Sequence, residues 1–368
     1  MAGRRLFVGT RKGLFVCEVD GSACTVKSTE FLGVQVPVVC CSPNDDFVIA
    51  GLNHGHFGSK MHRSRDGGTT WEEISPPIYP QKPDGAADIV DPGRNVVVPW
   101  SLELIWTVER SSNGTLWCGT IPGGLFRSDD DGDSWQLVES LWNRPERSKW
   151  FGGGYDFPGI HSICIHPDNP IQITVAISCG GVWQSNDEGQ SWECRSTGMR
   201  AAYVPPELAN DPDIQDPHRM VQCMGSPDHF WVQHHNGIFR STDNCQSWTE
   251  LEEFEPSTFG FAVAVHPNDP DTAWFVPAIK DEVRIPKDGR FVVMRTQDGG
   301  ASIELLDSGL PANAAYDLVY RHALEVADDG ETLAMGSTTG NVWIGTNGGN
   351  NWSVVSNHLP PIFSVRWG

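Results

Sequence analysis

The stretch Ser64-Arg65-Asp66-Gly67-Gly68-Thr69-Thr70-Trp71 has the pattern Ser or Thr, any residue, Asp, any residue, Gly, any residue, Ser or Thr, and Trp. Five more copies follow, two complete and three degenerate: Ser128–Trp135, Ser185–Trp192, Ser241–Trp248 with Cys245 for Gly, Thr296–Ile303 without Trp, and Gly345–Trp352 with Asn347 for Asp. The copies end at positions 71, 135, 192, 248, 303 and 352. A motif that returns at such spacing predicts a stacked or radial repeat.

Each repeat also contains strand-like segments in a fixed order around the eight-residue motif. They are an apolar run such as 163–165, a second strand such as 115–120, a Gly-rich turn with a third strand such as 123–128, and a strand after the motif such as 136–138. Four short strands per repeat, joined by Gly-rich turns, are typical of a propeller blade. We therefore predict an all-β fold made of four-stranded antiparallel blades.

The two ends of the chain complete the count of blades. Residues 6–15 match the two middle strands of a repeat whose motif has decayed, and residues 362–366 resemble an innermost strand. We predict that this tail joins the N-terminal blade, because a ring closed by both termini leaves no long unpaired strand edge. The prediction is a seven-bladed β-propeller that forms a single domain over residues 1–368.

Composition limits the classes of partner and the cellular compartment. The net charge is −21, which disfavours nucleic acid and anionic membranes as partners. The ten cysteines include no Cys-x-x-Cys pair, so we expect reduced thiols. The apolar run near the N-terminus is too short for a signal peptide, and no segment has the length of a membrane span. We expect a soluble, cytoplasmic protein whose oligomeric state the sequence does not define.

The motif itself is expected to have a structural role. Its Asp can accept hydrogen bonds from backbone N–H groups in the turn, its Gly permits a positive φ, and its Trp can pack between blades. The Asp residues of the motif are therefore not candidates for catalysis. The function must be sought in the loops instead.

These motifs resemble the Asp-boxes, or BNR repeats, of sialidase-like propellers, a superfamily that includes sialidases, xyloglucan hydrolases and photosystem II stability/assembly factors. The phrase Asn53-His54-Gly55-His56-Phe57-Gly58 further resembles bacterial BNR repeat glycosyl hydrolase-like proteins. The resemblance covers nearly the whole chain and implies the propeller fold, but it says little about activity. No aligned arginine triad is visible, and Arg284-Ile285-Pro286 lies between the fourth and fifth motif copies, so a true sialidase is not expected.

Candidate metal ligands follow from the position of each histidine in its repeat. The motif turns lie on one face of a propeller, and the opposite face carries the blade connections and the turns between second and third strands. Long loops on that face, 79–99, 141–159, 199–217 and 280–290, are expected to be functional. Five histidines are predicted there and could bind a divalent transition metal such as Zn: His54, His56, His161, His218 and His235. Hydrogen-bonded histidines without a metal are the alternative.

Charged and aromatic residues are expected near the same channel mouth. We assign candidate catalytic roles to Glu103, Asp317 and Arg321, and candidate ligand-binding roles to Arg11, Lys12, Arg284 and Trp150. The acids of the segment 210–216 are interpreted as part of a solvated loop.

Two functions remain open on the sequence alone. The first is a polar pocket that binds or hydrolyses a small molecule or glycan, with or without a metal. The second is a non-enzymatic scaffold for protein interaction, similar to the photosystem II stability/assembly factors. A deep polar well with convergent His and carboxylate groups favours the first function, and a broad flat surface favours the second.

Overall fold

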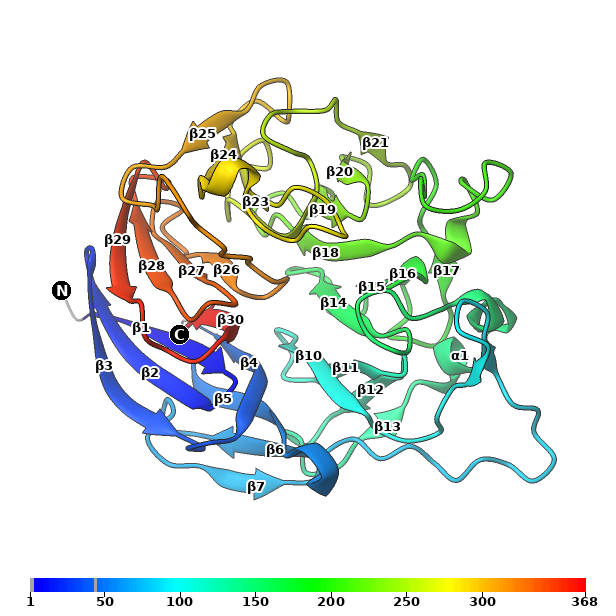
Figure 1. Cartoon of the computed structure of the whole chain (residues 1–368). Helices are drawn as coiled ribbons and strands as arrows, with labels where there is room; N and C mark the ends of the chain where they lie inside the picture. The colour runs from blue at the N-terminus through cyan, green and yellow to red at the C-terminus, as the bar shows by residue number, and fades with distance from the viewer. Residues whose placement is uncertain (1–2, 43–44) are drawn as a thin grey trace.

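The computed structural model describes residues 3–42 and 45–368, and it is a seven-bladed β-propeller (Figure 1). Each blade is a four-stranded sheet in which sequential strands pair antiparallel. The predicted all-β fold, the number of blades and the number of strands per blade are confirmed. In the described part of the chain, no helix has the length and apolar character that crossing a bilayer requires.

Blades are numbered here in chain order. Blade 1 contains β1 (Arg4–Thr10), β2 (Gly13–Asp20), β3 (Ala23–Glu30) and β30 (Ile362–Trp367). Blade 2 contains β4 (Gln35–Ser42), β5 (Asp45–Asn53), β6 (Ser59–Ser64) and β7 (Glu72–Ile74). Blade 3 contains β10 (Leu104–Arg110), β11 (Leu116–Ile121), β12 (Leu125–Ser128) and β13 (Gln136–Leu137). Blade 4 contains β14 (Ile160–Ile165), β15 (Ile173–Ile177), β16 (Gly181–Ser185) and β17 (Glu193–Cys194).

The second half of the ring has the same order. Blade 5 contains β18 (Pro217–Gln222), β19 (Phe230–His234), β20 (Gly237–Ser241) and β21 (Thr249–Glu250). Blade 6 contains β22 (Gly260–Val265), β23 (Ala273–Pro277), β24 (Val293–Thr296) and β25 (Glu304–Leu306), and blade 7 contains β26 (Leu324–Val326), β27 (Leu333–Gly336), β28 (Val342–Thr346) and β29 (Asn351–Ser356). The remaining elements are the hairpin β8 (Val90–Asp91) and β9 (Val96–Val97), the helix α1 (Glu139–Trp142), and the 3₁₀ turns η1 (Gly55–Phe57), η2 (Pro145–Lys149), η3 (Pro212–Ile214) and η4 (Lys287–Gly289).

Ring closure uses both ends of the chain, as predicted. The sheet of blade 1 has the order β3-β2-β1-β30, so the C-terminal strand is the innermost one. Leu6 pairs with Trp367, and Val8 pairs with Val365, in antiparallel register. Strands from opposite ends of the sequence therefore lie side by side at the ring's closing point (Figure 1).

The eight-residue motif forms a turn between the third and fourth strands, and its Asp holds that turn together. Asp66 Oδ1 accepts a hydrogen bond from the backbone N–H of Thr70 at 2.8 Å, and Ser64 Oγ accepts one from the N–H of Gly68 at 2.8 Å. The Thr70 N–H and hydroxyl lower the pKa of Asp66 to about 2. The same Asp contact recurs in four other copies, at Asp130, Asp187, Asp243 and Asp298. The predicted structural role of the motif is confirmed in these turns.

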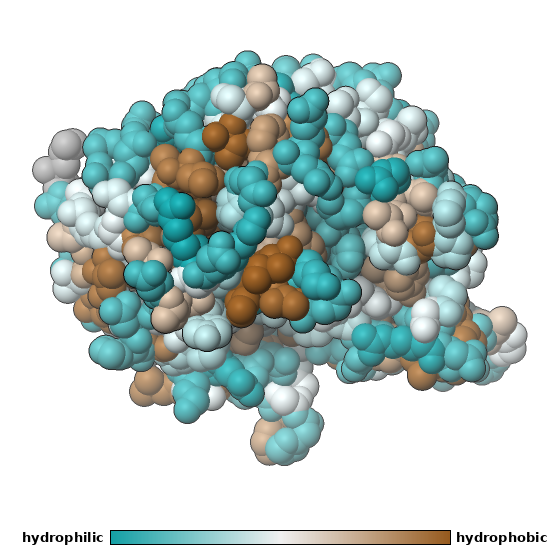
Figure 2. Space-filling view, turned by 45° about the horizontal axis from the view of Figure 1, so that its top comes forward, coloured by the Kyte–Doolittle hydropathy of each residue, from teal (hydrophilic) through white to brown (hydrophobic). Residues whose placement is uncertain are grey.

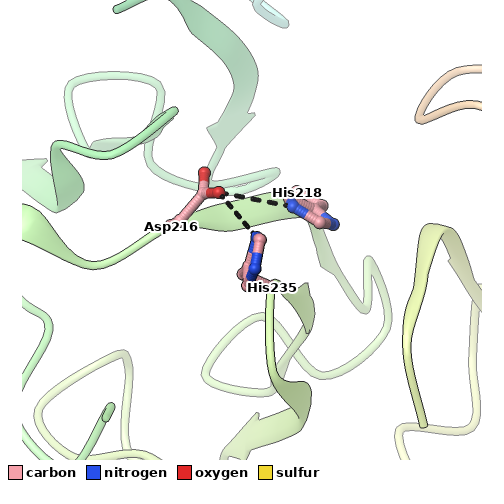
Figure 3. A group of neighbouring side chains, drawn as sticks. All are labelled: Asp216, His218 and His235. Carbon is pink, nitrogen blue, oxygen red and sulfur yellow. Dashed lines mark ion pairs between the residues drawn. The ribbon is translucent and has the colours of Figure 1, made fainter. Parts of the chain in front are cut away.

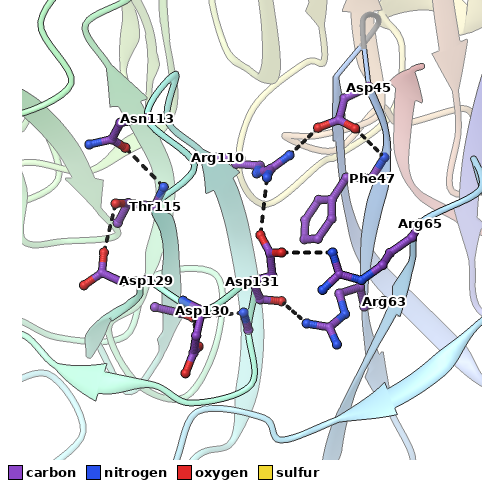
Figure 4. A network of polar contacts seen from close by, with 12 residues as sticks. Asp45, Phe47, Arg63, Arg65, Arg110, Asn113, Thr115, Asp129, Asp130 and Asp131 are labelled. Carbon is purple, nitrogen blue, oxygen red and sulfur yellow. Dashed lines mark hydrogen bonds and ion pairs between the residues drawn. The ribbon is translucent and has the colours of Figure 1, made fainter.

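A periodic contact joins each of these blades to the next. The residue just before the motif reaches the fourth residue of the next blade's motif. The pairs are Arg63 with the Asp131 carbonyl at 2.8 Å, Arg127 with Glu188 at 3.0 Å, Gln184 with Asn244 at 2.9 Å, Arg240 with the Gly299 carbonyl at 3.1 Å, and Arg295 with the Gly348 carbonyl at 2.9 Å. Figure 4 shows the first of these pairs, with Arg65 and Arg110 also bound to Asp131. We call this repeated contact the blade latch.

The core lies between the faces of neighbouring blades. A fully buried Trp contributes to it from five successive blades: Trp117, Trp183, Trp231, Trp274 and Trp343. Large aromatic side chains bury much apolar surface and fill the space between adjacent sheets. This rigid ring leaves the loops on one face free to form a site.

Candidate metal centre

A cavity of about 520 Å³ opens on the face opposite the motif turns. It lies above blades 4 to 6, and its lining comes from the connections between blades and from the turns between second and third strands. The lining residues are Phe151, Gly153, Gly154, Cys179, Ala202, Tyr203, Asp216, His218, His235, Asn236, Ser257, Thr258, Phe259, Phe261, Lys280, Asp281, Glu282 and Arg284. Three of the four long loops predicted to be functional therefore contribute to it. Its volume is in the usual range for a small-molecule site, about 300–1,000 Å³.

Asp216 lies at the base of this cavity, directly before β18, and is 3 % exposed. Its Oδ1 accepts hydrogen bonds from the backbone N–H of Cys179 at 3.1 Å and from Ser178 Oγ at 3.3 Å. Its own backbone N–H donates to Nε2 of the buried His234 at 3.0 Å. Burial alone would favour the neutral acid, but His218 and His235 outweigh it and hold the pKa of Asp216 well below its usual range.

Two histidines face the second oxygen of this carboxylate (Figure 3). Asp216 Oδ2 lies 3.3 Å from Nε2 of His218, on β18, and 3.4 Å from Nδ1 of His235, in the turn after β19. Tyr203 packs edge-on against the His235 ring at 4.7 Å, and Phe261 stacks on the His218 ring at 4.5 Å. Blade 5 alone therefore supplies all three polar groups, and its neighbours fix their orientation.

The tautomer of His218 follows from its second ring nitrogen. Nδ1 lies 2.7 Å from the carbonyl oxygen of Gly260, and because a carbonyl can only accept, Nδ1 carries a proton. Burial lowers the pKa of His218, although Asp216 opposes that shift. Whenever this ring is neutral, the lone pair of Nε2 points at a carboxylate oxygen. A second proton or a cation between these two atoms would remove the repulsion.

The three side chains have the composition of a metal site. Asp216, His218 and His235 each offer one ligand atom, and these atoms lie within 4.8 Å of one another. Ligand atoms about 2.0–2.1 Å from a tetrahedral Zn²⁺ are separated from each other by roughly 3.3–3.4 Å. Both separations that involve Asp216 match this value. The bond from His218 Nδ1 to Gly260 is also the outer contact that metal-binding imidazoles commonly make.

Of the five predicted histidine ligands, the structure brings two together. His218 and His235 are in the cluster, whereas His161 is fully buried on β14 with its Nδ1 beside Ser162 Oγ at 3.0 Å. His54 and His56 lie at η1 in blade 2, outside the cavity lining, and His56 is exposed.

The predicted catalytic residues are not assembled at one point. Glu103 is exposed and accepts a hydrogen bond from Ser101. Asp317 is buried, and its carboxylate accepts hydrogen bonds from Ser337 at 2.6 Å and Asn341 at 2.7 Å within blade 7. Arg321 is buried close to the cavity, since Gly154 on the cavity lining lies against its guanidinium.

The predicted ligand-binding residues do not lie together in the structure either. Arg284 lines the cavity and forms an ion pair with Asp281. Arg11 and Lys12 are exposed in the turn after β1 and do not line it. Trp150 is fully buried and packs against Trp183, so its ring has no surface for a ligand.

Asp216 is the functional candidate that sequence reasoning missed. The interpretation of residues 210–216 as a solvated loop is wrong for Asp213 and Asp216, which are both buried. The position of Asp216 two residues before His218 was the available signal, because residues i and i+2 at a strand terminus share one side. The buried His234 supports this position, because its Nε2 accepts the hydrogen bond from the Asp216 backbone N–H.

Comparisons with known proteins agree with the fold. No protein-family model matches the chain. A sialidase from Bacteroides fragilis is 23 % identical over 208 residues, which are 49 % of this chain and 38 % of the sialidase. The chain thus spans well under half the length of this relative.

Two solved structures are similar over almost the whole chain. The GH74 xyloglucanase from Xanthomonas campestris gives a TM-score of 0.66 at 17 % identity, covering 97 % of this chain and 53 % of the xyloglucanase. YCF48 bound to a D1 peptide gives a TM-score of 0.52 at 15 % identity, covering 91 % of this chain and 90 % of YCF48. The chain is therefore a propeller with hydrolase and YCF48 propellers as structural neighbours, which confirms the expected resemblance to sialidase-like propellers at the level of the fold.

Proposed function

We propose that this protein binds a divalent transition metal through Asp216, His218 and His235 and uses it to bind and hydrolyse a small molecule. The observation that supports the proposal most directly is the convergence of Nε2 of His218 and Nδ1 of His235 on one buried carboxylate oxygen, at 3.3 and 3.4 Å. A metal held by three protein ligands keeps open positions for water and substrate. Such a metal polarises a substrate oxygen and lowers the pKa of a bound water.

The surroundings of the cluster favour a small ligand over an extended surface contact. The cavity of about 520 Å³ has the cluster at its base and the charged pair Asp281 and Arg284 in its lining. On the face of the molecule that Figure 2 shows, hydrophobic side chains form separate patches among hydrophilic ones. A concave polar site with convergent ligands is typical of a ligand pocket rather than of a flat docking surface.

Metal binding is tested by elemental analysis of the purified, untagged protein and by calorimetric titration with Zn²⁺. We expect one metal per chain in the native protein. Asp216→Asn and His235→Ala should each weaken Zn²⁺ binding by more than about 100-fold, because even loss of an outer contact costs up to about that factor. His56→Gln is the matched control, since His56 is an exposed histidine outside the cavity, and it should bind Zn²⁺ as the native protein does.

Hydrolysis is tested on the same samples with small chromogenic esters, amides, phosphoesters and glycosides. Activity should require the metal and should be lost in Asp216→Asn but not in His56→Gln. Native protein that takes up no metal would contradict the proposal. Equal metal binding by Asp216→Asn and His56→Gln would contradict it as well. The non-enzymatic interaction scaffold, the second function that the sequence left open, would then be the better interpretation. A protein partner should then be sought.

The cytoplasmic location remains a prediction. All ten cysteines are free in the structure, as expected for reduced thiols. Labelling of the thiols in freshly lysed cells would check it.

A further inference from the structure

A second polar group near the cluster makes no hydrogen bond or ion pair within the described residues. Arg321, just before β26, is 5 % exposed, and its guanidinium lies over the rings of Trp106 at 4.9 Å and Phe261 at 5.4 Å. Among residues 3–42 and 45–368 it forms no ion pair with any carboxylate. A buried cation without a counter-ion is costly, so the group is expected to serve a ligand.

The unpartnered atoms of Arg321 define which ligand fits. Its Nε and Nη2 are both buried and make no hydrogen bond within the described residues. These two atoms form one edge of the planar guanidinium, and their N–H bonds point in the same direction. That edge matches the two oxygens of a carboxylate, which it can bind through two parallel hydrogen bonds.

Arg321 is adjacent to the metal cluster through a shared aromatic ring and a shared loop. Phe261 contacts both the His218 ring and the Arg321 guanidinium. The segment Gly152-Gly153-Gly154, called here the glycine flap, comes close to both Asp216 and Arg321. A Cβ added at Gly153 would be 3.2 Å from Asp216 Oδ2, and one added at Gly154 would be 3.0 Å from Arg321 Nη2.

Gly154 of the glycine flap both lines the cavity and approaches Nη2 of Arg321. Gly153 and Gly154 line the cavity and are themselves exposed, and only residues without a side chain allow so close an approach. A small shift of this flap would join the Arg321 edge to the space in front of the cluster.

We propose that Arg321 is a carboxylate-binding subsite, so that the substrate of the metal site is a small carboxylic acid with a second oxygen close to its carboxylate. This assignment rests on the proposed metal function. The carboxylate binds the Nε and Nη2 edge beneath the glycine flap, and the neighbouring oxygen faces Asp216, His218 and His235. The glycine flap moves to admit the ligand.

The test uses glycolate, which has a carboxylate and an adjacent hydroxyl, and glycolamide, its uncharged analogue. Thermal unfolding of the Zn²⁺-loaded full-length protein should shift upward with glycolate and much less with glycolamide, because a ligand that binds the native state stabilises it. Arg321→Gln should weaken glycolate binding about tenfold or more, since it removes a charge-assisted pair of hydrogen bonds. Arg321→Lys keeps the charge without the paired donors and should give an intermediate value.

Gly154→Ala provides a variant that leaves Arg321 in place. Its added Cβ would be 3.0 Å from Nη2, so glycolate binding should fall while the Zn²⁺ content stays unchanged. Equal protection by glycolate and glycolamide, or full glycolate binding in both Arg321→Gln and Gly154→Ala, would overturn the subsite. Protection by inorganic phosphate in the absence of any by glycolate would overturn the assignment to carboxylates.

Metal content measured on every sample separates the two proposals. Glycolate binding that depends on Arg321 in a protein that takes up no metal would contradict the metal function alone. A metal-loaded protein that binds glycolate equally well with and without Arg321 would contradict the subsite alone.

Discussion

His235 links the chemistry of the cluster to pH. Burial opposes its charged form, but the Asp216 carboxylate outweighs burial and raises the pKa of His235. In the metal-free protein this pair therefore stabilises the fold at pH values below the ordinary His pKa, and that contribution is lost as the pH rises through the raised value. A metal would take the place of this proton.

Metal affinity should consequently fall in acid. We expect Zn²⁺ to bind about tenfold or more weakly at about pH 6 than at about pH 7.5, because each imidazole must lose its proton before it can act as a ligand. Calorimetric titration at the two pH values checks this. His56→Gln should show the same dependence as the native protein, and an affinity that does not change over this range would argue against His235 as a ligand.

At the scale of the single residue, the sequence predicted part of the cluster. His218 and His235 could be placed on the correct face because each occupies a known position in its repeat. Asp216 could not, because its neighbours Asp211 and Asp213 suggested a polar loop, and only the hydrogen bonds from Ser178 and Cys179 in the preceding blade explain its burial. Contacts between different blades are not encoded in the spacing of one repeat.

At the scale of the element, the blade latch accounts for the Arg that precedes several motif copies. Arg295 on β24 is 7 % exposed and donates to the Gly348 carbonyl of blade 7, while Glu304 pairs with the same guanidinium. Arg295→Met keeps a similar apolar stem but removes these bonds. We expect a loss of about 1–3 kcal/mol in the free energy of unfolding, the usual effect of leaving buried polar groups unpaired.

Urea unfolding of Arg295→Met measures this loss. The matched control is Arg290→Met, because Arg290 also pairs with a carboxylate, Asp307, but is half exposed. An exposed ion pair contributes about 0–1 kcal/mol, so the control should remain close to the native protein. Equal losses in both variants would show that the latch adds nothing beyond a surface ion pair.

At the scale of the whole molecule, the ring was predictable because the repeat fixes both strand order and blade number. The terminal strand β30 followed from its apolar pattern and from the incomplete first repeat. The charged pairs inside the channel could not be predicted from the sequence, because their members face one another across the ring. Arg366 on β30 forms ion pairs with Glu109 of blade 3 and with Glu325 of blade 7.

This triad should make ring closure sensitive to pH. Arg366→Met leaves Glu109 and Glu325 half-buried without their cation, and we expect it to destabilise the fold by about 2–4 kcal/mol near neutral pH. Burial already raises the pKa of Glu325 to about 7 against the opposing effect of Arg366. Without Arg366 that carboxyl should take up its proton at still higher pH, so the loss should be smaller in acid than in alkali.

Thermal unfolding at about pH 5 and about pH 8 tests this pH dependence in Arg366→Met. The triple variant Arg366→Met, Glu109→Gln, Glu325→Gln serves as its control. Because the triple variant removes all three charges together, it should recover most of the stability lost in Arg366→Met, as neutral replacements of buried ion networks commonly do. A triple variant as unstable as Arg366→Met would mean that the Arg366 side chain closes the ring through its packing. The other outcome is that the triple variant recovers the lost stability at pH 8 but differs little from Arg366→Met at pH 5. That result would establish that unpaired carboxylates, and not lost contacts, open the ring between β30 and its neighbours.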